Sequence, residues 1–157
     1  MNDLPLRERR VAGVYLRAER FFVYPYSRTT SGVLIGTEPV TTLAGSATDE
    51  EIGHAVQGAL GNYRSGVRHP SLEEFDQLQA QDPVLTAAGV KSLATFSKGA
   101  LACRVSQEAG AISVVPSRPG RTKGSFLSAL EFEVYLDVAD GAAALGGAVR
   151  RALEQVR

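Results

Sequence analysis

The hydrophobic period changes several times along the chain, and these changes limit the fold more than any other feature. The first third contains strand-like segments rich in branched and aromatic residues, at 11–16 and 21–26, with shorter ones at 33–36 and 40–43. The first two are separated by a short charged stretch, which indicates a hairpin. Pro25 cannot donate a ladder hydrogen bond, so we expect its strand to lie at a sheet edge or to end there.

Two capping boxes then mark the starts of helices, at Thr48–Glu51 and Ser71–Glu74. Apolar residues repeat at helical spacing over 52–63, which predicts one buried stripe on the first helix. Pro83 interrupts the second helical segment, and Gly89 is expected to end the turn that follows. Three apolar residues are expected to form the buried face of the second helix: Leu72, Phe75 and Leu78.

The pattern then returns to strands. Segments 92–97, 100–106 and 111–116 are predicted to form a three-stranded meander, with Lys98-Gly99 as the first tight turn. Charged and apolar residues alternate over 131–136, as they do in a strand with one solvated face.

The chain ends with an amphipathic helix, for which Asp140 is the expected N-cap. Gly146 and Gly147 weaken this helix, and we expect them to allow close packing against the sheet. The element order predicts an α+β fold with a mostly antiparallel sheet, two central helices and a C-terminal helix packed on it. Residues 1–157 are expected to form one domain.

Composition excludes several classes of protein. The 17 basic and 17 acidic residues give zero net charge, which argues against a surface that binds nucleic acid or anionic membrane all over. The polar start of the chain lacks a signal-peptide core, and the apolar runs are too short to span a bilayer. The single cysteine cannot form an internal disulfide, so we expect a protein of the bacterial-type cytosol.

The neutral total conceals charge that is segregated along the chain. Residues 1–30, 31–44, 45–82, 83–128 and 129–157 carry net charges of +3, −1, −5, +5 and −2. The acidic and basic segments either neutralise each other in the fold or present two surfaces that attract partners of opposite charge. A further alternative is a scaffold that binds RNA or a host protein through the basic segment 83–128.

No catalytic constellation, metal site or cofactor site emerges from the residues. His54, His69 and Cys103 are far apart in the sequence and lack ligand spacing, so the histidines are interpreted as surface or boundary groups. Strand alternation places Cys103 with Leu101 and Val105, which predicts a small core residue. The acidic pairs Glu50-Glu51 and Glu73-Glu74 lie in first turns, where they stabilise helices.

The loop 117–124 is the best candidate for contact with an anion. Arg118, Arg121 and Lys123 alternate there with hydroxyl groups and glycines, although the spacing is not that of a phosphate-binding P-loop. A solvated loop is the plainer interpretation. The functional alternative is a small anion- or nucleotide-binding protein, or an enzyme, that uses this loop.

Three segments suggest a family. Thr95–Cys103, Ala111–Ser117 and Arg20–Pro25, with the acidic helical segment between them, resemble the immunity proteins of bacterial contact-dependent growth inhibition systems. The resemblance implies a cytosolic protein that binds the C-terminal toxin domain of an effector, often a nuclease, and blocks its active site. It also implies that the chain has no catalytic residues of its own and no direct contact with nucleic acid or membrane.

An acidic surface is the expected toxin contact, because carboxylates can imitate the phosphates that a nuclease binds. Six residues are predicted to form it: Asp49, Glu50, Glu73, Glu74, Asp76 and Asp82. In the opposite arrangement, an acidic toxin surface meets Arg118, Arg121 and Lys123.

Overall fold

The computed structural model describes residues 8–120 and 125–157 and confirms the α+β class. Its elements, in chain order, are β1 (Arg10–Arg17), β2 (Arg20–Thr29), β3 (Leu34–Gly36), β4 (Thr41–Ala44), α1 (Asp49–Gly61), β5 (Arg64–Val67), α2 (Leu72–Ala80), α3 (Pro83–Ala88), α4 (Leu93–Ser97), β6 (Leu101–Glu108), β7 (Ala111–Pro119), β8 (Phe126–Ser128), η1 (Leu130–Phe132), β9 (Val134–Asp137), η2 (Val138–Asp140) and α5 (Gly141–Gln155).

The sheet is built around the predicted β1–β2 hairpin. Its main strand order is β3-β2-β1-β6-β7-β8, while β4 and β5 also pair with β2, and β9 pairs with β7. Every pairing is antiparallel except that of β5 with β2. Val14 of β1 lies between Val23 of β2 and Cys103 of β6, so the centre of the sheet is apolar.

The expectation for Pro25 is wrong, because β2 is a central strand that continues to Thr29. Pro25 lies opposite Ala12, and its carbonyl accepts a hydrogen bond from the Thr37 amide at 2.9 Å. On that side, β2 pairs with two different strands in succession: β4 pairs with residues 20–23 and β3 with residues 26–28, so Pro25 lies between the two pairings. The missing N–H therefore falls in a gap between ladders and interrupts neither of them.

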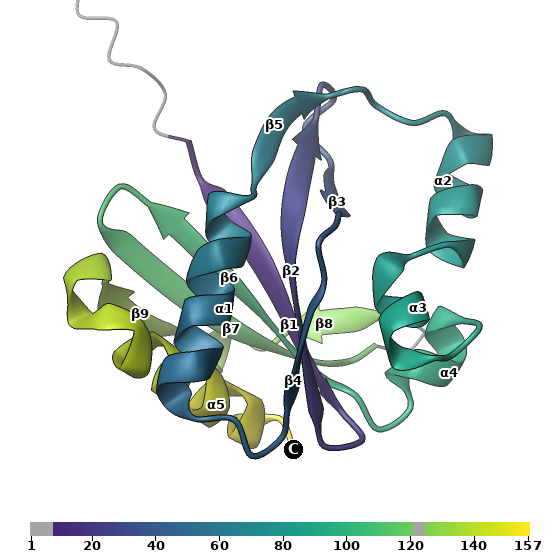
Figure 1. The fold of residues 1–157 in the computed structure, drawn as a ribbon. Coiled ribbons are helices and arrows are strands. Elements are labelled where there is room, and N and C mark those ends of the chain that lie inside the picture. The colour runs from purple at the N-terminus through teal and green to yellow at the C-terminus, as the bar shows by residue number, and fades with distance from the viewer. Residues whose placement is uncertain (1–7, 121–124) are drawn as a thin grey trace, which may run out of the picture.

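Helices α1 and α5 lie side by side across one face of the sheet (Figure 1). The predicted stripe of α1 and the apolar side of α5 close the main core together with β1, β2, β6 and β7. Each fully buried Val, Leu or Ile side chain of such a core contributes about 1.5–3 kcal/mol relative to exposure. The largest buried members are Phe21, Ile52, Leu60, Leu145 and Leu153.

The two helices touch through their backbones at two glycines. A Cβ at Gly146 would lie 1.7 Å from the carbonyl oxygen of Asp49, and one at Gly53 would lie 1.8 Å from that of Ala142. The predicted close packing at Gly146 is therefore present, but its partner is α1 rather than the sheet.

A second, aromatic core covers part of the opposite face, beneath α3 and α4. The segment 92–97 predicted as a strand is helix α4, so the three-stranded meander is a two-stranded hairpin and Lys98-Gly99 ends the helix. Ser92 caps α4 by accepting the Thr95 amide at 3.1 Å, and the turn places Phe96 in the core with no exposed surface. A helix of five residues is too short to display the 3.6-residue period.

The predicted start of α2 is correct, but its predicted buried face is wrong. Both capping boxes are present, with Thr48 accepting the Glu51 amide at 3.1 Å and Ser71 the Glu74 amide at 3.2 Å. None of the residues of α2 is buried, and Leu72 is 87% and Leu78 46% exposed. Helical spacing places apolar residues on one face, but no neighbouring element covers that face here.

Smaller corrections concern the last third of the chain. Residues Ser117–Pro119, predicted as loop, belong to β7, and the strand predicted at 131–136 begins only at Val134. Asp140 precedes α5, but its carboxylate accepts the Asp137 amide at 2.8 Å and makes no cap bond to α5.

The contact between α1 and α5 leads to a stability prediction. Gly53→Ala or Gly146→Ala should lower the free energy of unfolding by at least about 2 kcal/mol, because the added methyl group meets backbone that cannot move alone. Gly58→Ala is the matched control in α1, since a Cβ there meets nothing within 4 Å, and it should stabilise by up to about 1 kcal/mol. Chemical denaturation measures all three, and equal effects at Gly53 and Gly58 would contradict this account.

Candidate partner-binding surface

Helix α2 presents three of the six predicted acidic residues, which we call the α2 acidic surface: Glu73, Glu74 and Asp76. Glu73 and Asp76 are exposed and three residues apart, so they project from one side of the helix next to Leu72. Carboxylates beside an exposed leucine give this side both charge and apolar area, a combination typical of binding surfaces.

Glu74 has a structural role as well. Its carboxylate accepts hydrogen bonds from the Arg68 guanidinium, one of them at 3.1 Å, and from the Ser71 amide at 3.2 Å. These hydrogen bonds lower the pKa of Glu74 from 4.5 to about 2, with the Arg68 contact as the largest cause. His69 provides a second link between α2 and the sheet. Its Nδ1 forms a hydrogen bond with the Thr29 hydroxyl at 2.9 Å, and its ring packs edge-to-face with that of Phe75.

An open groove separates α2 from the sheet, and we call it the β3–α2 groove. It comprises two adjoining hollows of about 200 and 300 Å³, both of which include Ile35 and Leu78. Phe75 and Pro83 add apolar area, while Glu74 and Asp82 contribute carboxylates to its rim. The groove was not predicted from the sequence, because Phe75 and Leu78 were expected to lie on the buried face of the helix.

Asp82, also predicted as a contact residue, is half-buried at the N-cap of α3. It accepts the Val84 amide at 2.9 Å, and burial raises the pKa of its carboxyl. Its position makes it part of the groove and less accessible to a partner than Glu73 or Asp76.

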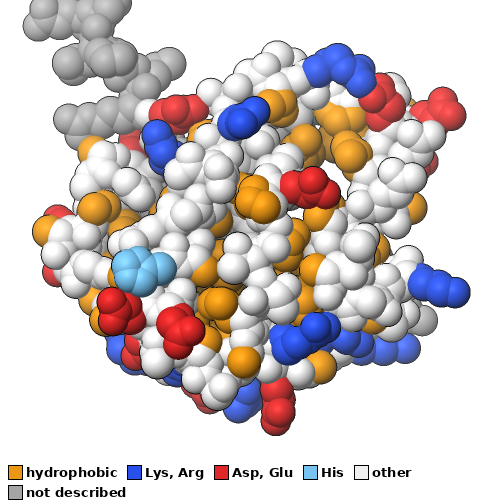
Figure 2. Space-filling model, viewed as in Figure 1, with side chains coloured by type: hydrophobic (Ala, Val, Ile, Leu, Met, Phe, Trp, Pro, Cys, Tyr) orange, Lys and Arg blue, Asp and Glu red, His pale blue; other side chains and the backbone are white. Residues whose placement is uncertain are grey.

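Asp49 and Glu50, which we call the α1 acidic pair, lie apart from α2. Asp49 accepts a hydrogen bond from Nε of Arg150 at 2.9 Å, and Glu50 lies 3.4 Å from Nε2 of His54. Figures 1 and 2 show acidic side chains over the start of α1, beside a histidine, and a separate acidic group over α2 across the same view. The structure therefore divides the predicted acidic residues between two places.

The described residues of the acidic and basic segments do not pair with each other. Among the residues that the structure describes, no ion pair joins 45–82 to 83–128. Some of these charges pair elsewhere instead, since Arg68 pairs with Glu74, Arg118 with Glu131 and Arg150 with Asp49.

The predicted anion-binding loop is only partly within the described residues. Arg118 lies in β7, pairs with Glu131 at 2.7 Å and stacks over the Phe132 ring with its guanidinium carbon 5.3 Å from the centroid. These contacts already occupy its guanidinium. Arg121 and Lys123 lie outside the described residues, so anion binding by the loop remains a prediction.

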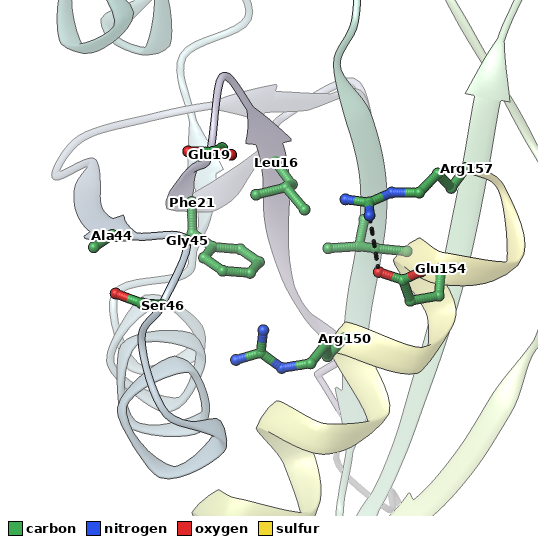
Figure 3. A pocket seen from close by; sticks show the side chains of 10 residues that line it. Leu16, Glu19, Phe21, Ala44, Gly45, Ser46, Arg150, Glu154 and Arg157 are labelled. Carbon is green, nitrogen blue, oxygen red and sulfur yellow. Dashed lines mark ion pairs between the residues drawn. The ribbon is translucent and has the colours of Figure 1, made fainter.

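A pocket of about 560 Å³ lies between the β1–β2 turn, the end of β4 and α5 (Figure 3). Its floor is apolar, with Phe21 and Leu153, and its rim combines acidic and basic groups. Arg150 is held by Asp49 and by the Ala47 carbonyl at 2.5 Å, while Arg157 lies 3.5 Å from Glu154. Both arginines of the pocket are therefore paired, and Arg150 links α5 to the start of α1.

Other reactive groups occupy structural positions. Cys103 is buried in the main core as predicted, and burial raises the pKa of its thiol to about 12, so the thiol stays neutral. His54 is exposed and His69 half-buried, in agreement with the sequence interpretation. Within residues 8–120 and 125–157, no group of three or more His, Cys, Asp or Glu side chains is arranged to hold a metal ion.

Solved structures share this fold. A protein of unknown function from Neisseria meningitidis, NMB0488, has a TM-score of 0.78 with 18% identity, and the likeness covers 100% of both chains. A chain of the CdiA-CT/CdiI toxin and immunity complex from Yersinia pseudotuberculosis has a TM-score of 0.75 with 18% identity, covering 96% of this chain and 98% of that one. No curated protein matches the sequence.

The structure defines a small α+β protein with an exposed, charged helix α2. Residues 11–155 match the family described as CdiI, CDI immunity protein. The chain therefore belongs to the CDI immunity protein family, and the resemblance drawn from the sequence is confirmed. In the part of the chain that the structure describes, no helix is both long and apolar enough to cross a membrane.

The pairing of Glu74 predicts a pH-dependent attachment of α2. Because the folded pKa is lowered, the carboxylate stabilises the helix fully above about 4.5, and the contribution is lost as the pH falls toward 2. An NMR titration of the Glu74 carboxyl carbon should show a midpoint near 2, and Arg68→Gln should raise that midpoint. A midpoint that Arg68→Gln leaves unchanged would exclude Arg68 as the main cause.

Proposed function

We propose that this protein binds and neutralises the C-terminal toxin domain of a contact-dependent growth inhibition effector, without catalysing a reaction. It acts in the cytosol of the producing cell by covering a surface that the toxin needs. Membership of the CDI immunity protein family supports the immunity role. The observation that carries the choice of site is α2, a helix with no buried residue that combines apolar and acidic side chains beside an open groove.

The toxin contact is centred on the α2 acidic surface. Leu72 provides apolar area that becomes buried when a partner docks, and burial of that area supplies affinity. Glu73 and Asp76 provide negative charge that no described residue pairs with, and this charge speeds association with a basic partner. A nuclease domain is such a partner, because the surface that binds nucleic-acid phosphates is cationic.

The α1 acidic pair contributes less to this contact. Arg150 already pairs with Asp49, and the pair lies away from α2. Asp82 lines the groove, so a partner side chain that enters the groove would reach it.

Co-expression tests the function itself. The toxin domain encoded immediately upstream of this chain should stop growth when it is expressed alone, and co-expression of this protein should restore growth. The two proteins should also co-purify at a fixed stoichiometry. If the protein neither protects cells nor binds that domain, the proposed function is wrong.

Charge reversal tests the site. Glu73→Lys with Asp76→Lys should slow association with the toxin domain on the order of tenfold at low salt, and the effect should shrink as salt screens the charges. Glu74 is left intact because it caps α2 and pairs with Arg68. Stopped-flow kinetics give the rate constants.

Two further variants serve as controls for this experiment. Glu108→Lys changes an exposed carboxylate at the end of β6, away from α2, and should alter the rate by less than about twofold. Glu50→Lys tests the α1 acidic pair and should have a small effect. A larger effect at Glu50 than at Glu73 and Asp76 would move the contact to α1.

A further inference from the structure

The end of the β1–β2 hairpin and the end of helix α4 together carry three basic residues, and the two elements meet where Arg17 lies over the Phe96 ring. We call these residues the hairpin basic cluster: Arg17, Arg20 and Lys98. Arg17 and Arg20 are directly opposite each other in the hairpin, and Lys98 follows Phe96 by two residues at the end of α4. Like charges placed directly opposite across a hairpin destabilise it unless an anion lies nearby.

Aromatic rings, rather than carboxylates, hold these arginines in place. The guanidinium carbon of Arg17 lies 5.6 Å from the Phe96 ring centroid, and that of Arg20 lies 5.2 Å from the Phe22 ring. Both rings are buried, and they pack edge-to-face at 5.8 Å. Stacking on fixed rings orders a guanidinium in advance, so less side-chain entropy is lost when its outer nitrogens bind a partner.

No acidic side chain of the described residues forms an ion pair with the hairpin basic cluster. None of the three cations takes part in an ion pair between described residues, and the sequence from Pro83 to Gln107 contains no Asp or Glu. Glu19 lies within the hairpin turn but lines the pocket on the other face with Leu16 and Phe21 (Figure 3).

Arg17 provides a second, independent sign that the cluster lacks a partner. Its Nε is buried without a hydrogen-bond acceptor, and among the described residues it is the only buried side-chain nitrogen or oxygen in that state. A buried donor without an acceptor carries a desolvation penalty, and a guanidinium with no anion nearby increases it. An external carboxylate on the outer nitrogens would balance the guanidinium charge and so reduce the electrostatic part of this penalty, while Nε itself keeps no acceptor.

We propose that the hairpin basic cluster is a second contact surface, which binds carboxylate side chains of the same toxin domain. The proposal rests on the proposed function and specifies the partner further. Helix α3 links α2 to α4 along one side of the molecule, with acidic side chains at its α2 end and basic side chains over the hairpin end and α4 (Figures 1 and 2). A toxin surface with the reverse order of charges would bind in one orientation only.

A nucleic-acid partner fits the cluster less well. Phe22 and Phe96 are buried beneath the arginines and offer no ring on which a base can stack. A group of three cations also differs from the extended basic track that follows a phosphate backbone.

Zero-length carbodiimide cross-linking of the complex tests the carboxylate partner directly, because it joins a lysine only to a carboxylate in contact with it. Mass spectrometry should identify a cross-link from Lys98 to an Asp or Glu of the toxin domain encoded upstream. Lys98→Arg should abolish the cross-link while it leaves the association rate within about twofold, since the charge is kept.

Kinetics supply the second readout. Arg20→Glu should slow association about fivefold or more at low salt, whereas Arg151→Glu, the same change at an exposed arginine of α5, should have less than about a twofold effect. If the wild-type protein binds the toxin, an absent Lys98 cross-link together with equal rates for the two variants overturns the basic contact and leaves the proposed function standing.

Two further outcomes would also overturn the proposed basic contact. If the wild-type protein does not bind the toxin at all, both proposals fall. A fluorescently labelled RNA oligonucleotide that binds the wild-type protein but not Arg20→Glu, with toxin association unchanged, would assign the cluster to nucleic acid and overturn this inference.

Discussion

The backbone contact between α1 and α5 is the constraint on which the rest of the structure depends. Gly53 and Gly146 let each helix approach a carbonyl of the other, so the pair lies on the sheet as one unit and seals the main core. Arg150 reinforces this unit from α5, because it pairs with Asp49, binds the Ala47 carbonyl and lies 5.7 Å from the Phe21 ring centroid. Part of the acidic charge at the start of α1 is thereby used to hold the fold together.

The helices between β5 and β6, which are α2, α3 and α4, are not part of the main core. Because α1 and α5 complete the main core on one face, the smaller aromatic core on the other face needs only α3 and α4. Helix α2 contributes to neither core and is attached through its caps, Arg68 and His69. A helix that stability does not require to be buried can carry the exposed leucine and carboxylates that a partner needs. The division between a rigid helix pair and an exposed binding helix follows from this packing.

The sequence predicted most of the framework and part of the candidate site. Segments with a long, strong pattern were correct, among them the β1–β2 hairpin, the stripe of α1 and both capping boxes. The errors concern features that local pattern does not encode. Segment 92–97 is too short to show its period, and Pro25 is tolerated only because β3 and β4 part beside it. Leu72 and Leu78 share the character of core residues, but whether a neighbour covers them is a tertiary fact.

For the site, the sequence located the acidic residues but not their division between α1 and α2, which depends on how the helices are placed. The hairpin basic cluster was not predicted from the sequence either, because Arg17 and Arg20 are far in sequence from Lys98. The absence of acidic residues from 83 to 107 was a usable signal for it. We propose that this protein recognises its partner through two oppositely charged surfaces, and the segregated charge of the chain supports this proposal.

Hydrogen–deuterium exchange of this protein, alone and bound to the toxin domain encoded upstream, tests that claim most directly. Binding should slow amide exchange in α2 and around the hairpin end and α4, while exchange in α1 and α5 stays as slow as in the free protein. Protection confined to the outer faces of α1 and α5, with α2 exchanging as in the free protein, would contradict it.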